Sequence, residues 1–228
     1  MGLGGLPPAL PVGPPATLTA VKLSAILPLP VAAARHPESV FTPVDGEPVL
    51  VRIVRGLTVE VTEVLVPADA AIYERARAGL AGSPARVIAA GENASTAECL
   101  TAAGPQLQAS AATHALVADH RHPVLSRDLL ARVVAALADG AELVVPVLPV
   151  TDTVKRVDGQ GVIRSTVDRS ELQITQYPYG AAVARLDDLP AVLSAAADLV
   201  CVAGDADAIP FDLPADAALL AAVIACRR

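Results

Sequence analysis

One stretch of this chain, from Pro146 to Pro178, holds the side chains best suited to bind a polar or anionic partner. Its four basic residues are Lys155, Arg156, Arg164 and Arg169. They stand among β-branched residues and hydroxyls in a protein that is otherwise acidic and rich in alanine. Ammonium and guanidinium groups are strong donors to anionic oxygens. We therefore expect this stretch to face a ligand or a second subunit.

The same stretch has the pattern of a β-hairpin. Two strand-like runs, 147–157 and 161–167, flank the sequence Asp158-Gly159-Gln160-Gly161. A short connection that contains glycine is typical of a hairpin. Because both faces are polar, the hairpin is unlike a buried parallel strand pair. We expect it to project from the body as an arm over about residues 148 to 178.

A second candidate site is Asp119, which ends the strand-like segment 113–119. Open α/β sheets bind ligands at the carboxyl ends of their strands. A carboxylate there suits a hard cation that bridges phosphates. His120 and His122 allow a rival interpretation, because an acid followed by two imidazoles can ligate zinc. We keep zinc as the minor hypothesis, since no further His or Cys lies nearby in the sequence.

The arm contains sequence motifs of a known family. Three ordered phrases, PVTDTVKR at 149–156, TVDRSEL at 166–172 and Gln176-x-Pro178, resemble the 2-C-methyl-D-erythritol 4-phosphate cytidylyltransferase family. The resemblance implies transfer of CMP from CTP to that polyol phosphate, with Mg²⁺ as cofactor, in isoprenoid precursor synthesis. It also implies a homodimer in which Thr153 and Arg169 reach across to the substrate phosphate. Lys155 is the catalytic candidate of the arm.

The nucleotide side of the resemblance is only partly preserved. The family pattern His-Asp-Ala-Ala-Arg-Pro corresponds to residues 118–123, where Asp119 and Pro123 match. The resemblance makes Asp119 a Mg²⁺ ligand. Arg121 lies one residue earlier than the family arginine, and we assign it to nucleotide binding.

Two further phrases carry predicted site residues. Within 90–96, Gly91 and Thr96 fit a nucleotide-contacting Gly-Gly-x-Arg-x-x-Ser segment, while Asn93 replaces the arginine. The simpler reading of this segment is a strand-to-helix turn capped by Ser95 or Thr96. Within 204–216, the resemblance makes Asp207 a second Mg²⁺ ligand.

The segment 29–38 departs most from the family. The family has a glycine-rich loop whose backbone amides surround a triphosphate, a role that glycine and nearby cations favour. Here the loop contains no glycine, Pro30 has no N–H, and Glu38 stands where the family has Lys. Arg35 is the one cation that can replace the loss, so we assign it a catalytic role. CTP binding is therefore doubtful.

These losses give three hypotheses. The first is a divergent cytidylyltransferase with weakened or lost activity that still binds a phosphorylated polyol or sugar. The second is a non-catalytic dimeric scaffold that acts through the arm, a pseudoenzyme. The third is a nucleotidyltransferase with a changed nucleotide or metal requirement. Because several charge-stabilising groups are missing, efficient CTP chemistry is not expected.

The elements that must position these residues alternate between strands and helices. Strands are expected at 21–28, 58–66, 85–90, 113–119, 141–147 and 199–203, and helices at 48–57, 69–79, 126–138 and 187–197. This alternation predicts an α/β fold with a doubly wound, mostly parallel sheet, nucleotidyltransferase-like and Rossmann-like, carrying the arm. We expect a disordered Pro/Gly-rich tail at 1–20 and one domain at 21–228.

Composition limits the partners. The net charge of −7 argues against nonspecific binding to nucleic acid, which needs an excess of Lys and Arg. No apolar run is long enough to span a bilayer, so we expect no membrane partner. The three cysteines, Cys99, Cys201 and Cys226, are scattered and odd in number, which favours a reduced, cytoplasmic setting.

Overall fold

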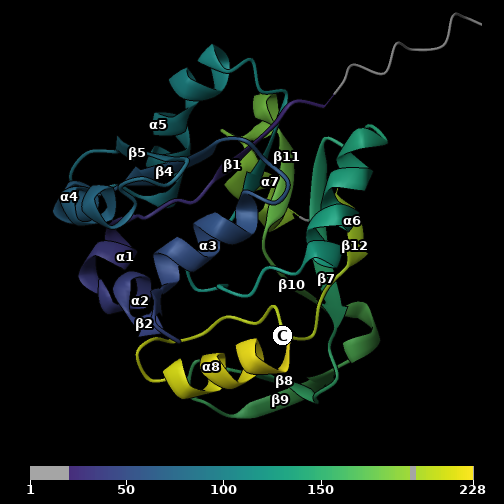
Figure 1. Cartoon of the computed structure of the whole chain (residues 1–228). Coiled ribbons are helices and arrows are strands. Elements are labelled where there is room, and N and C mark those ends of the chain that lie inside the picture. Colours follow the sequence, from purple (N-terminus) through teal and green to yellow (C-terminus); the bar gives the residue numbers. More distant parts are fainter. Residues whose placement is uncertain (1–20, 196–198, 228) are drawn as a thin grey trace, which may run out of the picture.

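The protein is built on one mixed β-sheet with helices on both faces (Figure 1). The computed structural model describes residues 21–195 and 199–227, so the predicted tail at 1–20 lies outside it. The eight strands follow the order β10-β7-β11-β6-β1-β4-β5, and β12 pairs with β7. Their bounds are β1 Leu23–Ile26, β4 Val64–Ala68, β5 Ala85–Ala89, β6 His114–Val117, β7 Leu143–Pro149, β10 Gln173–Thr175, β11 Tyr179–Ala182 and β12 Val200–Ala203.

The sheet combines a parallel and an antiparallel part. Strand β1 lies between β4 and β6, parallel to both, and β5 continues this part. Strand β11 is antiparallel and lies between β6 and β7, while β10 pairs antiparallel with the end of β7. The α/β class predicted from the sequence is confirmed. The central antiparallel strand β11 was not anticipated, because its sequence, YGAA, contains glycine and alanine instead of the β-branched residues typical of strands.

Two apolar cores cover the two faces of the sheet. Val64 and Val66 of β4 belong to one core, whereas Leu65 between them belongs to the other. Side chains that alternate in this way point to opposite faces, so β4 reads as a continuous apolar run. The first core includes side chains from α3 Val49–Leu57, α4 Ala70–Gly79, α6 Arg127–Ala138 and α8 Ala217–Cys226; the second includes α5 Thr96–Ala109 and α7 Leu189–Ala195.

Capping residues fix where the main helices begin. The Asp69 carboxylate accepts a hydrogen bond from the N–H of Ala71, and the Ser126 hydroxyl accepts one from Leu129. Ser95 caps α5 in a reciprocal arrangement with Glu98. These caps were expected from the sequence and are confirmed. The expected helix at 187–197 is found at Leu189–Ala195, and its last two residues lie outside the described part of the chain.

The strand expected at 58–66 was wrong over its first half. The N–H of Thr58 donates to the carbonyl of Val54, and the N–H of Val61 donates to that of Leu57. These bonds extend the end of α3 into a turn, and Val59 is left 46% exposed. The alternation of polar and apolar residues is therefore not a strand there, and sheet pairing starts at Val64.

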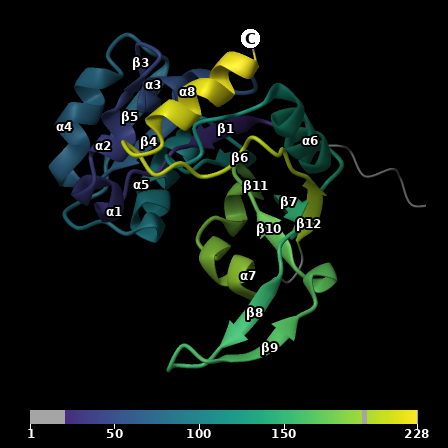
Figure 2. The same ribbon diagram turned by 90° about the horizontal axis from the view of Figure 1, so that it is seen from below.

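The predicted arm is present and projects from the body (Figure 2). It is formed by β8 Val154–Val157 and β9 Ile163–Val167, which pair only with each other among the described strands. The run predicted as one strand, 147–157, is divided between β7 in the sheet and β8 in the arm. Asp158 closes the turn by accepting bonds from the N–H groups of Gln160 and Val162.

The remaining elements are short: helices α1 Val31–Arg35 and α2 Glu38–Phe41, a small hairpin of β2 Pro43–Val44 and β3 Glu47–Pro48, and single 3₁₀ turns at Arg169–Glu171 and Val183–Arg185. Within the described residues, no helix has both the length and the apolar character needed to cross a membrane.

Candidate functional site

Two adjoining cavities open at the carboxyl ends of β1 and β6. The first, of about 200 Å³, is mostly apolar and is lined by residues that include Pro28, Leu100 and Tyr177. The second, of about 330 Å³, is more polar and is lined by residues that include His36, Ser39 and Arg121. Both are also lined by the shared set Pro30, Thr96, Asp119 and His120. This is the edge at which open α/β sheets bind ligands.

Asp119 is held by an arginine two residues further on. The backbone N–H and the side-chain Nε of Arg121 donate to its Oδ1 at 2.8 and 3.2 Å, and a terminal nitrogen of Arg121 donates to Oδ2 at 3.0 Å. Burial alone would raise the pKa of Asp119. The bonds from Arg121 outweigh burial and keep the pKa below its usual value. Asp119 is therefore a carboxylate whose charge is already balanced.

Of the two histidines beside Asp119, His122 packs against an aromatic ring. Their Nδ1 atoms are 3.6 Å (His120) and 4.0 Å (His122) from Asp119 Oδ1. Burial lowers the pKa of both rings. The His122 ring lies 5.0 Å from Tyr177, which stacks on Tyr179 at 4.2 Å, and the His122 Nδ1 is buried without a hydrogen-bond partner. This arrangement does not support the zinc hypothesis.

The second predicted metal ligand, Asp207, is also paired within the chain. Arg227 donates to Asp207 Oδ2 at 2.8 Å and to both oxygens of Asp205 at 2.6 Å. Over residues 21–195 and 199–227, no group of three or more His, Cys, Asp or Glu side chains is arranged to hold a metal ion. With Asp119 bound by Arg121 as well, the predicted carboxylates do not fit Mg²⁺ in this arrangement.

A buried glutamine ties the segment after β12 to the arm's return strand. The side-chain amide of Gln176 donates to the carbonyls of Asp205 and Ala208, and its Oε1 accepts from the N–H of Asp205. Gly204 makes room for it, because a Cβ there would lie 2.2 Å from Gln176 Oε1. The phrase Gln176-x-Pro178 marked this residue in the sequence, but its positioning role was missed.

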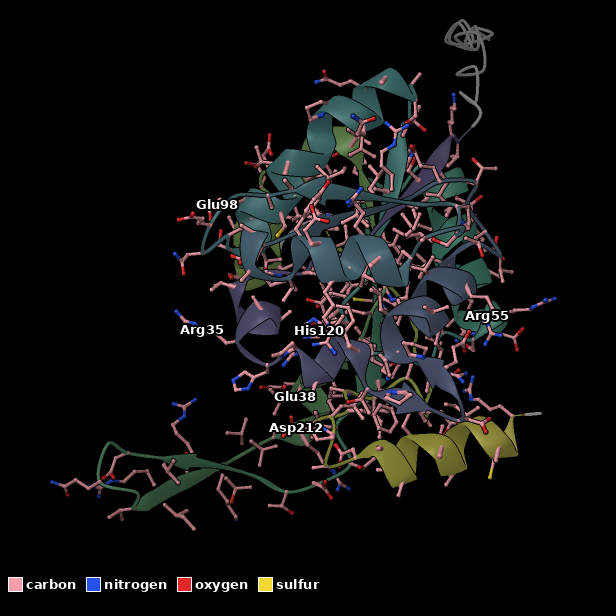
Figure 3. All side chains as sticks on the ribbon, turned by 60° about the vertical axis from the view of Figure 1, so that its left-hand side comes forward. Arg35, Glu38, Arg55, Glu98, His120 and Asp212 are labelled. Atoms are coloured by element: carbon pink, nitrogen blue, oxygen red, sulfur yellow. The ribbon has the colours of Figure 1, made fainter. Side chains whose placement is uncertain are left out.

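Part of the segment 29–38 is helical, where the sequence suggested a loop. Residues 31–35 form α1, in which the N–H of Ala34 donates to the carbonyl of Pro30, and the N–H of Val31 donates to the carbonyl of Ala94. These two amides are therefore not available to a phosphate. Arg35 ends α1 at the surface and points outward (Figure 3). Among the described residues it has no ion-pair partner, and it lines neither cavity at this edge.

The other nucleotide-side residues divide into two groups. Thr96 lines both cavities at the start of α5. Gly91 is a turn residue with φ of 98°, and its carbonyl accepts from the N–H of Ala70. The buried Asp69, predicted only as a cap, also accepts from the N–H of Ala94 at 2.8 Å and so fixes this turn. The structure brings Thr96, Asp119 and Arg121 together, and leaves Gly91 outside both cavity linings.

The arm residues are exposed and lie apart from this edge. Lys155 donates through Nζ to the Thr166 hydroxyl at 2.6 Å, and the Arg169 guanidinium donates to the carbonyl of Thr151. Thr153 and Arg156 are exposed. In the part of the chain that is described, none of these side chains lines either cavity. One chain therefore does not bring the polyol-side and nucleotide-side candidates into one pocket.

The sequence of this chain is similar to those of known enzymes. A 2-C-methyl-D-erythritol 4-phosphate cytidylyltransferase from Saccharopolyspora erythraea is 36% identical over 163 residues, which cover 70% of this chain and 71% of the relative. A bifunctional enzyme from Rhizobium rhizogenes is 43% identical over 93 residues, but the match covers only 22% of its length.

Solved structures agree in fold. A crystal structure of 4-diphosphocytidyl-2C-methyl-D-erythritol synthase matches with a TM-score of 0.73 at 21% identity, covering 90% of this chain and 100% of that one. The Thermus thermophilus 2-C-methyl-D-erythritol 4-phosphate cytidylyltransferase matches with a TM-score of 0.65 at 23% identity and the same coverage. The family model for 2-C-methyl-D-erythritol 4-phosphate cytidylyltransferase matches residues 32–223. The chain therefore belongs to the 2-C-methyl-D-erythritol 4-phosphate cytidylyltransferase family.

Proposed function

We propose that this protein transfers the cytidylyl group of CTP to 2-C-methyl-D-erythritol 4-phosphate, and that it does so much more slowly than its relatives. The activity for which those relatives are named supports this cytidylyl transfer. The observation that carries the lower rate is the pairing of Asp119 with Arg121 beside a helical, glycine-free segment 29–38. In this chemistry the protein supplies mainly position and charge stabilisation, so an arginine that is already shared with a carboxylate stabilises the phosphate charge less than a free arginine would.

The two cavities suggest how the substrates divide. The apolar cavity, walled by Pro28, Leu100 and Tyr177, suits a planar base. The polar cavity beside it, with Arg121, His36 and Ser39, suits phosphate oxygens. In the reaction a phosphate oxygen of the polyol forms a bond to the α-phosphorus of CTP, and the bond to the β-phosphate oxygen breaks to release pyrophosphate. Arg121 is the cation placed to stabilise the negative charge of the phosphate groups during this transfer. Mg²⁺ is predicted by resemblance only, and no step of the reaction is assigned to it.

We further propose a homodimer in which the arm of one chain supplies Thr153 and Arg169, with Lys155, to the cleft of its partner. The exposed apolar residues of the arm region, among them Val157, Ile163 and Ile174, support an interface there. The free cysteines are compatible with a reduced cytoplasm.

The test is a pyrophosphate-release assay with CTP, Mg²⁺ and methylerythritol phosphate. We expect turnover at least about 100-fold below that of an ordinary family enzyme measured beside it. Equal turnover would contradict the proposed weakening.

A dimeric phosphopolyol-binding scaffold is the second candidate. It is favoured by the contrast between the exposed arm cations and the internally paired carboxylates. Calorimetric binding of methylerythritol phosphate, with no pyrophosphate release from CTP, would select it. A thermal-shift screen of nucleoside triphosphates separates both candidates from an enzyme with a changed nucleotide requirement, because a ligand that binds the native state raises its stability.

A further inference from the structure

A third cavity, of about 500 Å³, lies among α3, the segment 123–127 and α8. In the described part of the chain its charged lining residues are all arginines: Arg52, Arg55, Arg127 and Arg227. It shares no described lining residue with the two cavities at Asp119. Figure 3 shows Arg55 on the opposite side of the body from Arg35, with His120 between them. We call this third cavity the arginine pocket.

The carboxylates around the arginine pocket balance only part of its charge. One oxygen of Glu47 contacts both Arg55, at 2.8 Å, and Arg52, at 3.3 Å. The Arg52 side chain is only 13% exposed, and its Nε is buried without a hydrogen-bond partner. A buried donor left without an acceptor lowers stability, so most such donors in folded proteins are satisfied. Arg52 is therefore a cavity-lining cation that shares its one carboxylate partner with Arg55.

Arg127 lines the cavity without a carboxylate partner among the described residues. Its exposed side chain makes no hydrogen bond or ion pair there, and it is the first residue of α6. A cation in the first turn opposes the helix dipole and so lowers helix stability slightly. The charge of Arg127 is therefore available to an anion in the cavity.

Arg227 links the arginine pocket to the segment that follows β12. It lines the cavity while its guanidinium donates to Asp205 and Asp207. An anion in the cavity would share this guanidinium with the two carboxylates.

We propose that the arginine pocket binds a small polyanion carrying two or more phosphate groups. Guanidinium groups match phosphate oxygens in shape and charge. Of the four that line the cavity, Arg127 has no carboxylate partner among the described residues and Arg52 and Arg55 share one, which favours a ligand with more than one negative charge over a single phosphate. This site is separate from the proposed CTP and polyol cleft, so the inference holds whether or not the protein transfers cytidylyl groups.

Calorimetry with inorganic pyrophosphate tests the proposal. The full chain is titrated in EDTA at fixed ionic strength, with inorganic phosphate as the weaker-binding comparison. Arg127→Ala is expected to weaken pyrophosphate binding about 10-fold or more, because one charge-assisted contact is lost. Arg185→Ala is the matched control, because Arg185 pairs with Glu142 and lines none of the three cavities, and it should leave the affinity unchanged.

A second variant examines the link through Arg227. Asp207 contacts Arg227 through a side chain that is 48% exposed, so Asp207→Asn frees part of the guanidinium without disturbing the core. We expect pyrophosphate to bind about 2- to 5-fold more tightly to it, since binding and carboxylate pairing compete for one group.

Three results would overturn the inference. They are the absence of pyrophosphate binding to the wild-type chain, loss of binding in Arg185→Ala but not in Arg127→Ala, and equal effects of these two variants. Thermal melting of each variant shows that the fold is intact, and Arg127→Gln repeats the charge removal with a side chain of similar length.

Discussion

The carboxyl edge of the sheet and the projecting arm carry charge in opposite ways. At the edge, the carboxylates of Asp119, Asp205 and Asp207 are bound by Arg121 and Arg227 of the same chain. On the arm, Lys155 and Arg169 contact a neutral hydroxyl and a carbonyl, and Arg156 is exposed. These three edge carboxylates are paired within one chain, whereas the arm keeps cationic charge for a partner.

This difference shows why matching residue types is not enough to assign a site. Asp119 stands where the family pattern has its aspartate, yet its surroundings are set by Arg121, displaced by one position. A partly buried ion pair is costly to separate, because either charge alone would be left poorly solvated. The exposed cations of the arm have no such cost, since water already solvates them.

The comparison is tested most strongly by removing Arg121. Arg121→Ala should lower cytidylyl transfer about 100- to 1,000-fold, because the cation in the polar cavity is lost and Asp119 is left to repel phosphate. The measurement is kcat/KM from pyrophosphate release. Arg185→Ala, which breaks a surface pair with Glu142 at 2.8 Å, is the matched control and should have unchanged turnover. Higher activity in Arg121→Ala would show that the pair inhibits catalysis.

The rigidity of the edge is tested at Gly204. A Cβ at this position would lie 2.2 Å from Gln176 Oε1 and 2.9 Å from the carbonyl of Val147, so Gly204→Ala should lower the free energy of unfolding by about 2–3 kcal/mol. In contrast, Gly79 at the end of α4 has open space around it, and Gly79→Ala should raise that free energy by about 0.5–1 kcal/mol. Urea unfolding measures both; a harmless Gly204→Ala would mean that the Gln176 contact is loose.

The openness of the arm is tested at Arg169. Arg169→Ala should raise the KM for methylerythritol phosphate about 10-fold while leaving the melting temperature nearly unchanged, because its contact is exposed. Arg164→Ala, which removes another exposed arm cation paired with Asp158, is the control and should leave KM unchanged. A large drop in melting temperature with unchanged KM would make Arg169 structural.

The smallest expected effect concerns pH and the buried His122. Burial lowers the pKa of His122 in the folded state, so below a pH of about 6.5 the unfolded chain binds the extra proton and stability falls as pH decreases. His122→Phe keeps an aromatic ring beside Tyr177 and removes this titration. Between about pH 7.5 and 5 its melting temperature should fall a few degrees less than that of the wild type. Identical pH profiles would show that His122 does not contribute.

Local chemistry allowed much of the fold to be predicted. Asp69, Ser95 and Ser126 mark helix starts through short-range bonds that a single sequence displays. The apolar runs that become β4 and β6 are equally visible. The first half of the strand expected at 58–66 was wrong because its alternation also fits a turn whose amides bond back to α3.

The site was harder to predict because its contacts depend on chain segments far apart. Arg227 reaches Asp207 from the end of the chain, and Gln176 reaches Asp205 across 29 positions. Nothing local to Asp207 or Gln176 indicates these partners. Thr96, Asp119 and Arg121 were found because short phrases around the sheet edge marked them, and the structure brings these three together.

Strand β11 also has a consequence for biosynthesis. It fills the gap between β6 and β7, and it follows the arm in the chain, so the two parts of the sheet cannot join until residues 179–182 have left the ribosome. Until then β6 and β7 each present an open edge, which is where nascent chains pair wrongly and aggregate. The arm thus lengthens the interval during which the half-made sheet needs protection.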